Sequence, residues 1–381
     1  MEAENRQENS LGQVIRPLRL DHPRAWRTYL GGRMLDQFHG VEPAMDGHFP
    51  EEWIMSLTAA RNAGREEFEM EGMSRIVGDA GGRLLKEYIE ACPEACLGAC
   101  FRDTGKADTG VLVKLIDAAE RLTVQVHPDR ETAKALFQSE YGKTECWHIL
   151  GGRQVDGQEP CIYIGFQPGI TRERWKSAFD RQDIPEMLSL MHRFAVQPGE
   201  TILIQGGVPH AIGAGCFLVE IQEPTDYTIR IERTTPAGLT IDDRMCHQGL
   251  GFDRMFDCFH YDGVSREEAR KRWWIEPRTL RPGIRQLIGA PECRYFTLCE
   301  IAPQDELSLS TADCFYGLYV LEGSGQLSWS NGRMNLEKGD PIFVSAQAED
   351  VQIQAKAGEK LRVLQFSGGH LAPSPGLCDF L

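Results

Sequence analysis

Short apolar runs that end in tight turns recur along most of this chain, and they favour a mainly β fold. The pattern is clearest after Cys293, where strand-like runs follow one another at regular spacing: Tyr295–Ile301, Phe315–Leu321, Gly325–Trp329, Pro341–Val344 and Leu361–Phe366. Turns such as Asn331-Gly332 separate these runs. Short strands at this spacing predict an all-β barrel or sandwich in the C-terminal part.

The chain of 381 residues is long enough for two or three domains. We expect a metal-binding catalytic domain over 11–261, because helical patterns interrupt its strands and candidate metal ligands lie within it. Residues 262–290 change character, with a charged helix-like piece followed by Pro277 and Pro282, and they resemble a linker. We expect residues 291–381 to form a metal-free barrel, since the turns at its strand ends contain no histidine.

Potential metal ligands stand at the ends of predicted strands in two separate stretches. The first stretch holds Gln125 and His127, with Glu145 shortly after, and the second holds His210 in a Gly/Pro turn that follows the strand Thr201–Ile204. Gln125 and His127 are two residues apart, so on a strand they point to the same face. Two histidines, a carboxylate and an amide oxygen converging inside a barrel would form a divalent-metal site with one position open, which is a catalytic arrangement.

Composition excludes several other classes of protein. The net charge of −15 argues against a nucleic-acid partner. The chain contains no run of 18 apolar residues, so no membrane span is predicted. The polar start of the chain lacks the hydrophobic segment of a signal peptide, so we expect a cytoplasmic location. Twelve cysteines are scattered without a CxxC pair. Cys92, Cys96 and Cys100 have helical spacing, but Pro93 interrupts them and no histidine matches them, so reduced thiols are the expected state.

Four motifs carry a resemblance to a known family. They are Val113–Asp129, which contains Gln-Val-His-Pro-Asp, then Gly142–Glu145, Pro209–Gly215 and Val219–Asp226. In this order the motifs resemble the type I mannose-6-phosphate isomerase family, from about residue 30 to residue 230. The C-terminal part resembles the family only as a cupin barrel.

The resemblance implies a fold, a cofactor and a reaction. It implies tandem cupin (jelly-roll-like) β-barrels with a helical insertion in the first, and one zinc ion per chain. It also implies interconversion of mannose 6-phosphate and fructose 6-phosphate by a monomer or homodimer. By motif position the family's metal ligands fall on Gln125, His127, Glu145 and His210, and its catalytic residues on Lys143 and Arg230. The chain departs from the common family pattern at Gln205-Gly206-Gly207 and at Leu30-Gly31-Gly32.

Aldose–ketose isomerisation requires a proton to leave the carbon next to the carbonyl and return to its neighbour through an enediol(ate). Lys143 lies two residues before Glu145, so it can share that residue's face and move the proton, with a pKa lowered beside a divalent cation. Arg230 stays charged and could stabilise the enediolate or simply pair with a nearby carboxylate, Glu232 or Asp226. Glu220 and Asp226 are weaker base candidates.

Other residues with reactive side chains fit structural roles better. Asp129 is better explained as a helix N-cap than as a catalyst, and His148 and His192 lie on apolar segments where a structural role is expected. Because the chain is acidic overall, an anionic sugar phosphate would also need a locally basic pocket.

Two other functions use similar residues. An iron(II) cupin dioxygenase also uses two histidines and one carboxylate, but Gln125 as a fourth ligand and Lys143 beside the metal would leave too few open positions. A non-catalytic sugar-binding or regulatory cupin protein would not need an intact ligand set, and the sequence shows no helix-turn-helix or basic region. The zinc-dependent isomerase remains the leading interpretation.

Overall fold

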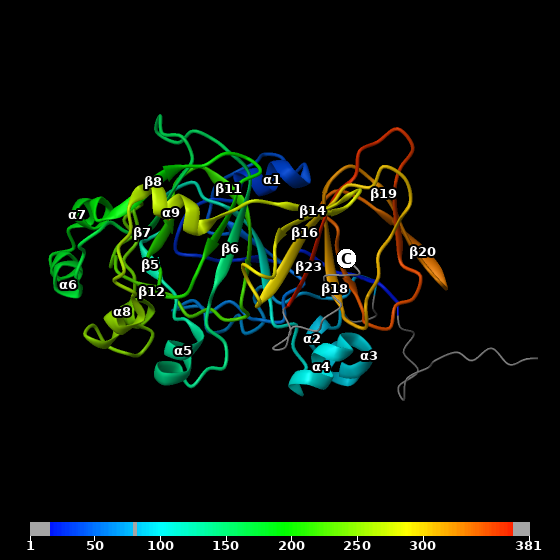
Figure 1. Ribbon diagram of the computed structural model, residues 1–381, viewed down its shortest axis with the longest axis horizontal. Helices are drawn as coiled ribbons and strands as arrows, with labels where there is room; N and C mark the ends of the chain where they lie inside the picture. The colour runs from blue at the N-terminus through cyan, green and yellow to red at the C-terminus, as the bar shows by residue number, and fades with distance from the viewer. Residues whose placement is uncertain (1–15, 79–81, 369–381) are drawn as a thin grey trace, which may run out of the picture.

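The computed structural model describes residues 16–78 and 82–368, and its architecture is mainly β. Two pairs of sheets lie side by side (Figure 1). All strand pairings among the described residues are antiparallel. Most neighbouring strands in these sheets are not consecutive in the chain, so the connections cross over between them.

The first pair consists of a seven-stranded and a five-stranded sheet. The seven-stranded sheet has the order β13 (Trp274–Ile275), β9 (Thr201–Ile204), β6 (Glu145–Gly152), β11 (Cys216–Gln222), β4 (Leu112–Asp117), β3 (Glu51–Ile54) and β2 (Arg24–Ala25). The five-stranded sheet has the order β12 (Ile229–Arg230), β5 (Gln125–Val126), β10 (His210–Ile212), β7 (Cys161–Phe166) and β8 (Met191–Ala195). Side chains from both sheets, including Trp147, Ile164 and Leu218, pack into one buried cluster between them.

The second pair consists of a seven-stranded and a four-stranded sheet. The larger has the order β1 (Leu18–Arg19), β21 (Pro341–Val344), β18 (Tyr316–Glu322), β23 (Arg362–Gly368), β16 (Phe296–Ile301), β15 (Ile284–Ile288) and β14 (Arg278–Arg281). The smaller has the order β17 (Leu307–Ser308), β22 (Gln352–Ala355), β19 (Gly325–Trp329) and β20 (Gly332–Leu336). Leu318, Leu327 and Ile353 belong to the buried cluster between these sheets.

Short helices lie around both pairs. They are α1 (Arg33–His39), α2 (Leu85–Ala91), α3 (Pro93–Leu97), α4 (Ala99–Thr104), α5 (Arg130–Phe137), α6 (Arg172–Asp180), α7 (Ile184–Ser189), α8 (Asp243–His247) and α9 (Arg266–Trp273), with a 3-10 helix at Arg254–Cys258. Figure 1 shows α6, α7 and α8 at the outer end of the first pair. In sequence α2–α4 fall between β3 and β4 of the first pair. In space they contact the second pair, because backbone hydrogen bonds join Cys96 to Ala346 and Ala99 to Asp313.

The two sheet pairs share a continuous apolar core. Val113 and Ile221 from the first pair and Phe296 and Phe366 from the second belong to one buried cluster. The N-terminal strand β1 pairs with β21, so the start of the described chain is built into the second pair. Removing such shared apolar surface from water stabilises the two pairs against each other.

The segment 262–290, predicted as a linker, is instead built into both sheet pairs. Helix α9 buries Ala269 and Trp273 in the core of the first pair, and β13 pairs with β9. Strands β14 and β15 then extend the second pair beside β16. Only residues 276–277 separate β13 from β14. Pro277 and Pro282, which suggested a linker, instead flank the edge strand β14.

The strands predicted above at Thr201–Ile204, Gly325–Trp329 and Pro341–Val344 are confirmed to the residue as β9, β19 and β21, and the apolar run Cys161–Phe166, which also predicts a strand, is β7. The sequence pattern of residues 185–192 predicts a helix, but α7 ends at Ser189 and His192 belongs to β8. There the backbone pairs with β7, which overrides a helical pattern of only two turns. Strands β20 and β22 are largely polar and were not predicted.

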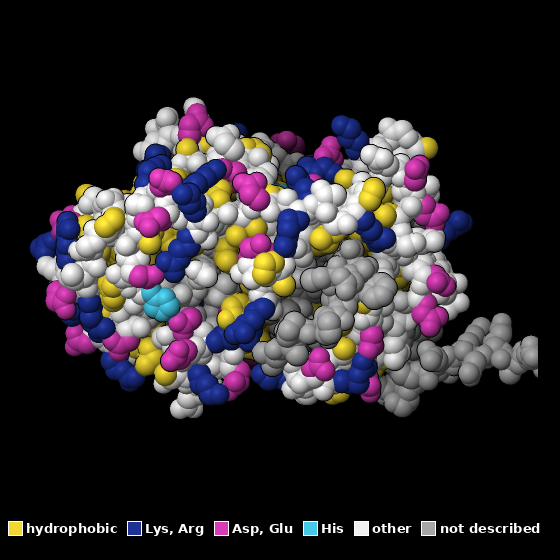
Figure 2. Space-filling view, in the orientation of Figure 1, with side chains coloured by type: hydrophobic (Ala, Val, Ile, Leu, Met, Phe, Trp, Pro, Cys, Tyr) yellow, Lys and Arg dark blue, Asp and Glu magenta, His cyan; other side chains and the backbone are white. Residues whose placement is uncertain are grey.

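The surface carries both signs of charge. On the face shown in Figure 2, Lys and Arg side chains alternate with Asp and Glu side chains and do not gather into one basic area. No helix in the described part of the chain is long and apolar enough to cross a membrane.

Candidate metal centre and pocket

Three of the predicted ligands meet between the two sheets of the first pair. His127 directly follows β5, and His210 begins β10, where it lies opposite Gln125 in the strand pairing. Glu145 begins β6 in the other sheet. The Glu145 carboxylate oxygens lie 3.1 Å from His127 Nε2 and 3.3 Å from His210 Nε2, and the two Nε2 atoms are 3.2 Å apart. All three side chains are buried.

Hydrogen bonds on the far side of each imidazole orient the rings. His127 Nδ1 lies 2.8 Å from the Tyr227 carbonyl oxygen, and His210 Nδ1 lies 2.9 Å from the Val208 carbonyl oxygen. A carbonyl only accepts, so each Nδ1 carries the proton and donates it. Each neutral ring therefore presents the lone pair of its Nε2 to the centre.

Burial also keeps both rings neutral. Burial, followed by the nearby Lys143 ammonium, lowers the pKa of His127 well below its usual value, and burial lowers the pKa of His210. Both Glu145 oxygens lack a hydrogen-bond donor. The two Nε2 lone pairs and the Glu145 carboxylate face one another without a proton between them, and this arrangement fits a divalent cation. The Nδ1 hydrogen bonds would hold the two rings in place around it.

Gln125 completes the predicted set. Its side-chain amide nitrogen is 3.3 Å from His210 Nε2. The oxygen and nitrogen of an amide exchange places on a half-turn of the side-chain end. Gln125 can thus present its oxygen to the same centre, as a fourth ligand would require.

Two glycines allow the loop before β10 to approach the His127 turn. A Cβ at Gly206 would lie 2.5 Å from the backbone of Asp129. Gly207 adopts a φ of +85°, and a Cβ there would meet the His260 ring. The Gly207 amide donates to the His127 carbonyl over 2.7 Å. Glycine at both positions is therefore required for this close approach, and the Gly-Gly pair, a departure from the common family pattern, supports the ligand geometry.

Lys143 lies beside the metal centre, as predicted. Its Nζ is 3.1 Å from His127 Nε2 and 3.6 Å from Glu145 Oε2. Burial lowers the pKa of Lys143, although the Glu145 carboxylate opposes this effect. The direction agrees with the expectation from sequence, but desolvation in the protein is sufficient to produce it.

A pocket opens from the centre and concentrates positive charge. It contains about 40 Å³ of free volume, and its lining includes four basic residues (Arg27, Lys114, Lys143, Arg230) and two acidic residues (Glu51, Glu220), together with Gln125. This is the local basic pocket that an anionic substrate requires in an acidic protein. An outer vestibule of about 870 Å³ lies next to it and shares Asn62, Arg230 and Met245 with the pocket.

Arg230 lines both the pocket and the vestibule. Its guanidinium donates to the backbone carbonyls of Met245, at 3.0 Å, and Thr228, at 3.3 Å. The two carboxylates considered as its partners are engaged elsewhere, since Glu232 pairs with Arg121 and Asp226 with Arg27. Arg230 thus keeps its charge available to a bound anion.

The sequence did not indicate how the other charged residues of the pocket are connected. Lys114 Nζ lies 2.9 Å from Glu220 and 3.6 Å from Glu51, and Arg27 lies 3.0 Å from Glu51. Glu220, considered as a base, also accepts from Trp147 Nε1, so both of its oxygens are occupied. Lys114 stands inside the apolar run of β4, and lysine is rarely buried without a partner. This was the signal in the sequence that a buried carboxylate should lie nearby.

The residues predicted to be structural have structural contacts. The Asp129 side chain accepts from the Thr132 amide at the start of α5, which confirms the N-cap. His148 contacts the Thr201 hydroxyl and His192 the Val264 carbonyl.

Comparisons with known proteins agree with this fold. Residues 288–363 match a family model described as the cupin domain of mannose-6-phosphate isomerase, in the part of the chain where the motifs gave only a general cupin resemblance. The chain is 36% identical over 237 residues to mannose-6-phosphate isomerase ManA of Bacillus subtilis. The aligned region covers 61% of this chain and 68% of that relative.

Solved structures agree in fold. A crystal structure of the Bacillus subtilis mannose 6-phosphate isomerase superposes with a TM-score of 0.69 at 22% identity, covering 92% of this chain and 99% of that one. A zinc-bound mannose 6-phosphate isomerase gives a TM-score of 0.69 at 16% identity, covering 93% and 99%. The chain therefore belongs to the type I mannose-6-phosphate isomerase family, within the cupin superfamily.

Proposed function

We propose that this protein interconverts mannose 6-phosphate and fructose 6-phosphate through an enediol(ate), with one zinc ion held by Gln125, His127, Glu145 and His210. The observation that carries the proposal is the convergence of two Nε2 lone pairs on a carboxylate without a donor, directly beside a basic pocket. The relatives named above are isomerases of this sugar phosphate. A bound zinc ion would polarise the sugar carbonyl and stabilise negative charge on its oxygen.

The side chains around the centre would supply the remaining chemistry. Lys143, with its lowered pKa, would take a proton from C2 of the aldose and return it to C1 as the ketose forms. Arg230 would stabilise the negative charge on the enediolate oxygens. Lys114 is held by two carboxylates and positions the pocket wall instead of transferring the proton.

We further propose that each sheet pair is a cupin barrel and that the second barrel holds no metal in its interior. The family-model match over 288–363 supports a cupin assignment for the second pair. In the first pair, the helices α2–α4 are an insertion between β3 and β4.

Metal analysis combined with a coupled isomerase assay tests the reaction. The purified protein should turn over mannose 6-phosphate, lose activity after treatment with a chelator and regain it with zinc. His210→Ala should remove the metal and the activity together. Free mannose should be a much poorer substrate, because binding the distant phosphate helps to align the reacting carbons.

Variants of the two basic residues test their roles. Lys143→Met and Arg230→Gln should lower kcat and kcat/KM together while metal is retained, which indicates loss of an interaction made in the transition state. Lys134→Met is the control, because Lys134 is exposed on α5 and pairs there with the similarly exposed Glu140. Wild-type kcat in both pocket variants would contradict the assigned roles, and a raised KM with unchanged kcat would instead assign them to phosphate binding.

A further inference from the structure

A second group of potential metal ligands lies on the opposite face of β3 from the pocket. Glu51 and Glu52 are neighbours on this strand, so their side chains point to opposite faces. Glu51 accepts from Tyr29 and Trp53 on the pocket side. Glu52 is fully buried and accepts from the Tyr319 hydroxyl of β18, in the second sheet pair, over 2.6 Å.

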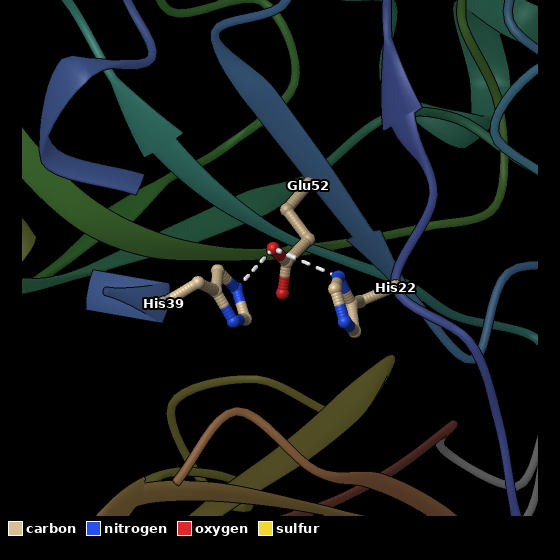
Figure 3. Close-up of side chains that lie close together, drawn as sticks. All are labelled: His22, His39 and Glu52. Carbon is tan, nitrogen blue, oxygen red and sulfur yellow. Dashed lines mark hydrogen bonds and ion pairs between the residues drawn. The ribbon is translucent and has the colours of Figure 1, made fainter. Parts of the chain in front are cut away.

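Two histidines from different segments converge on the free oxygen of Glu52 (Figure 3). His39, the last residue of α1, places Nε2 at 2.6 Å from Glu52 Oε2, and His22, between β1 and β2, places Nδ1 at 3.7 Å from the same oxygen. The two rings are stacked with centroids 4.5 Å apart and an interplanar angle of 11°. One ligand atom from each of the three residues lies within 4.8 Å of the others.

The negative charge of Glu52 faces these two histidines. Within the described residues, no lysine or arginine makes an ion pair with Glu52; its ion-pair partners are His22 and His39. A buried carboxylate without a compensating charge is costly. One protonated histidine could balance it, but two protonated rings stacked at this distance would repel each other.

A divalent cation satisfies all three groups at once. It would neutralise Glu52 and accept a lone pair from each imidazole, a ligand set suited to zinc and related metals. The Tyr319 hydroxyl already holds the other Glu52 oxygen, as outer hydrogen-bond partners of metal ligands do. A single ion pair would need one histidine, whereas the chain directs two at the same atom.

The exposure of the ligands also fits a site that can be filled from solvent. The His22 side chain is 51% exposed, whereas His39 is 12% exposed. Ligand atoms on a tetrahedral ion with bonds of 2.0–2.2 Å lie roughly 3.4 Å apart. His22 must therefore move slightly toward Glu52 from 3.7 Å, and His39 must move away from it from 2.6 Å. Solvent would occupy the remaining position.

We propose that Glu52, His39 and His22 form a second divalent-metal site, of the zinc class, distinct from the centre at Glu145. Through Tyr319 it joins α1 and the segment between β1 and β2 to the second sheet pair. The site would stabilise the contact between the two pairs, since an ion that binds only the folded chain raises its stability.

Zinc stoichiometry of the full chain tests this proposal. After removal of metal by a chelator, equilibrium dialysis against zinc followed by elemental analysis should give two equivalents for the wild type. His22→Ala should lower the affinity of one equivalent by at least about 100-fold, the upper end of the loss caused by removing an outer partner. Tyr319→Phe should weaken the same equivalent by about 10–100-fold.

His210→Ala separates the two sites, because it should remove the other equivalent and leave the His22-dependent one. His247→Ala is the matched control, since His247 belongs to neither cluster, and it should bind two equivalents. Zinc should raise the melting temperature of His210→Ala but not of the double variant that also carries His22→Ala. Unchanged zinc affinity in His22→Ala, or a single equivalent in the wild type that His210→Ala abolishes, would overturn the second site.

Discussion

Replacing Lys114 by methionine should destabilise the first sheet pair strongly. The Lys114 side chain is 2% exposed, and its Nζ is 2.9 Å from Glu220 and 3.6 Å from Glu51. Burial lowers the pKa of Lys114, but the Glu220 and Glu51 carboxylates more than offset this, so its pKa is raised. The ammonium is therefore charged in the folded protein, and Lys114→Met would leave two buried carboxylates with one cation fewer.

The expected magnitude follows from the burial of the pair. Removing one partner of a buried ion pair costs about 3–5 kcal/mol, whereas Glu220→Gln keeps an acceptor for Trp147 and should cost about 1.5–3 kcal/mol. Because the two residues lie opposite each other on β4 and β11, their effects should not add. The double variant should fall short of the sum by about 1–3 kcal/mol.

Urea unfolding followed by tryptophan fluorescence measures these free energies. Trp53 and Trp147 are buried against the two residues, so their emission reports on this part of the fold. Lys86→Met is the control, because Lys86 is 47% exposed and its contact with Glu90 is 4.0 Å long; it should cost less than about 1 kcal/mol. A loss below about 1 kcal/mol for Lys114→Met, or additive single variants, would show that the charge network does not hold this pocket together.

Two further predictions concern the loop around the metal centre. The hydrogen bond from His260 to Asp129 raises the pKa of His260 above 6.5 and lowers the pKa of Asp129 from 3.8 to about 2. The stabilisation from His260 is therefore complete below pH 6.5 and is lost as the pH rises through its folded pKa, and that from Asp129 is lost as the pH falls toward 2. An NMR titration should show Asp129→Asn returning the His260 pKa toward 6.5, and an unchanged value would contradict the contact. Gly206→Ala should push on the Asp129 backbone and lower zinc affinity at His127 by at least about tenfold, measured by dialysis; wild-type affinity would refute the close approach.

The strands were predictable where the local pattern agreed with the final pairing. Runs such as Cys161–Phe166 and Thr201–Ile204 combine β-branched and aromatic residues with turns on both sides, so local preference and sheet formation agree. The prediction failed at 262–290, where a charged helix and two prolines resemble a linker. Burial of Trp273 and pairing of β13 with β9 decide its structure, and neither contact is visible in a local pattern.

The convergence of the candidate metal ligands was predictable because these residues stand in short local motifs. Gln125 and His127 share a face by strand periodicity, Glu145 follows shortly after them, and His210 stands in a Gly/Pro turn after the strand Thr201–Ile204; the family motifs mark the same four residues. The charge pairs of the pocket were not predictable, because Lys114 and Glu220 are 106 residues apart in the sequence. Such pairs depend on strand register, which the turns and the hydrophobic faces of the whole sheet determine together.

Glu51 and Glu52 show most clearly what a single sequence leaves open. They are identical neighbours, and strand periodicity predicts only that they point to opposite faces. Glu51 meets Arg27 and Lys114 because that face looks into the first sheet pair, whereas Glu52 meets two histidines and Tyr319 because the second pair covers the other face. The packing of the two sheet pairs thus gives Glu51 a place in the basic pocket and gives Glu52 the two histidines of the proposed second site. A strand only four residues long then separates two sites that depend on charge, and each can be tested without disabling the other.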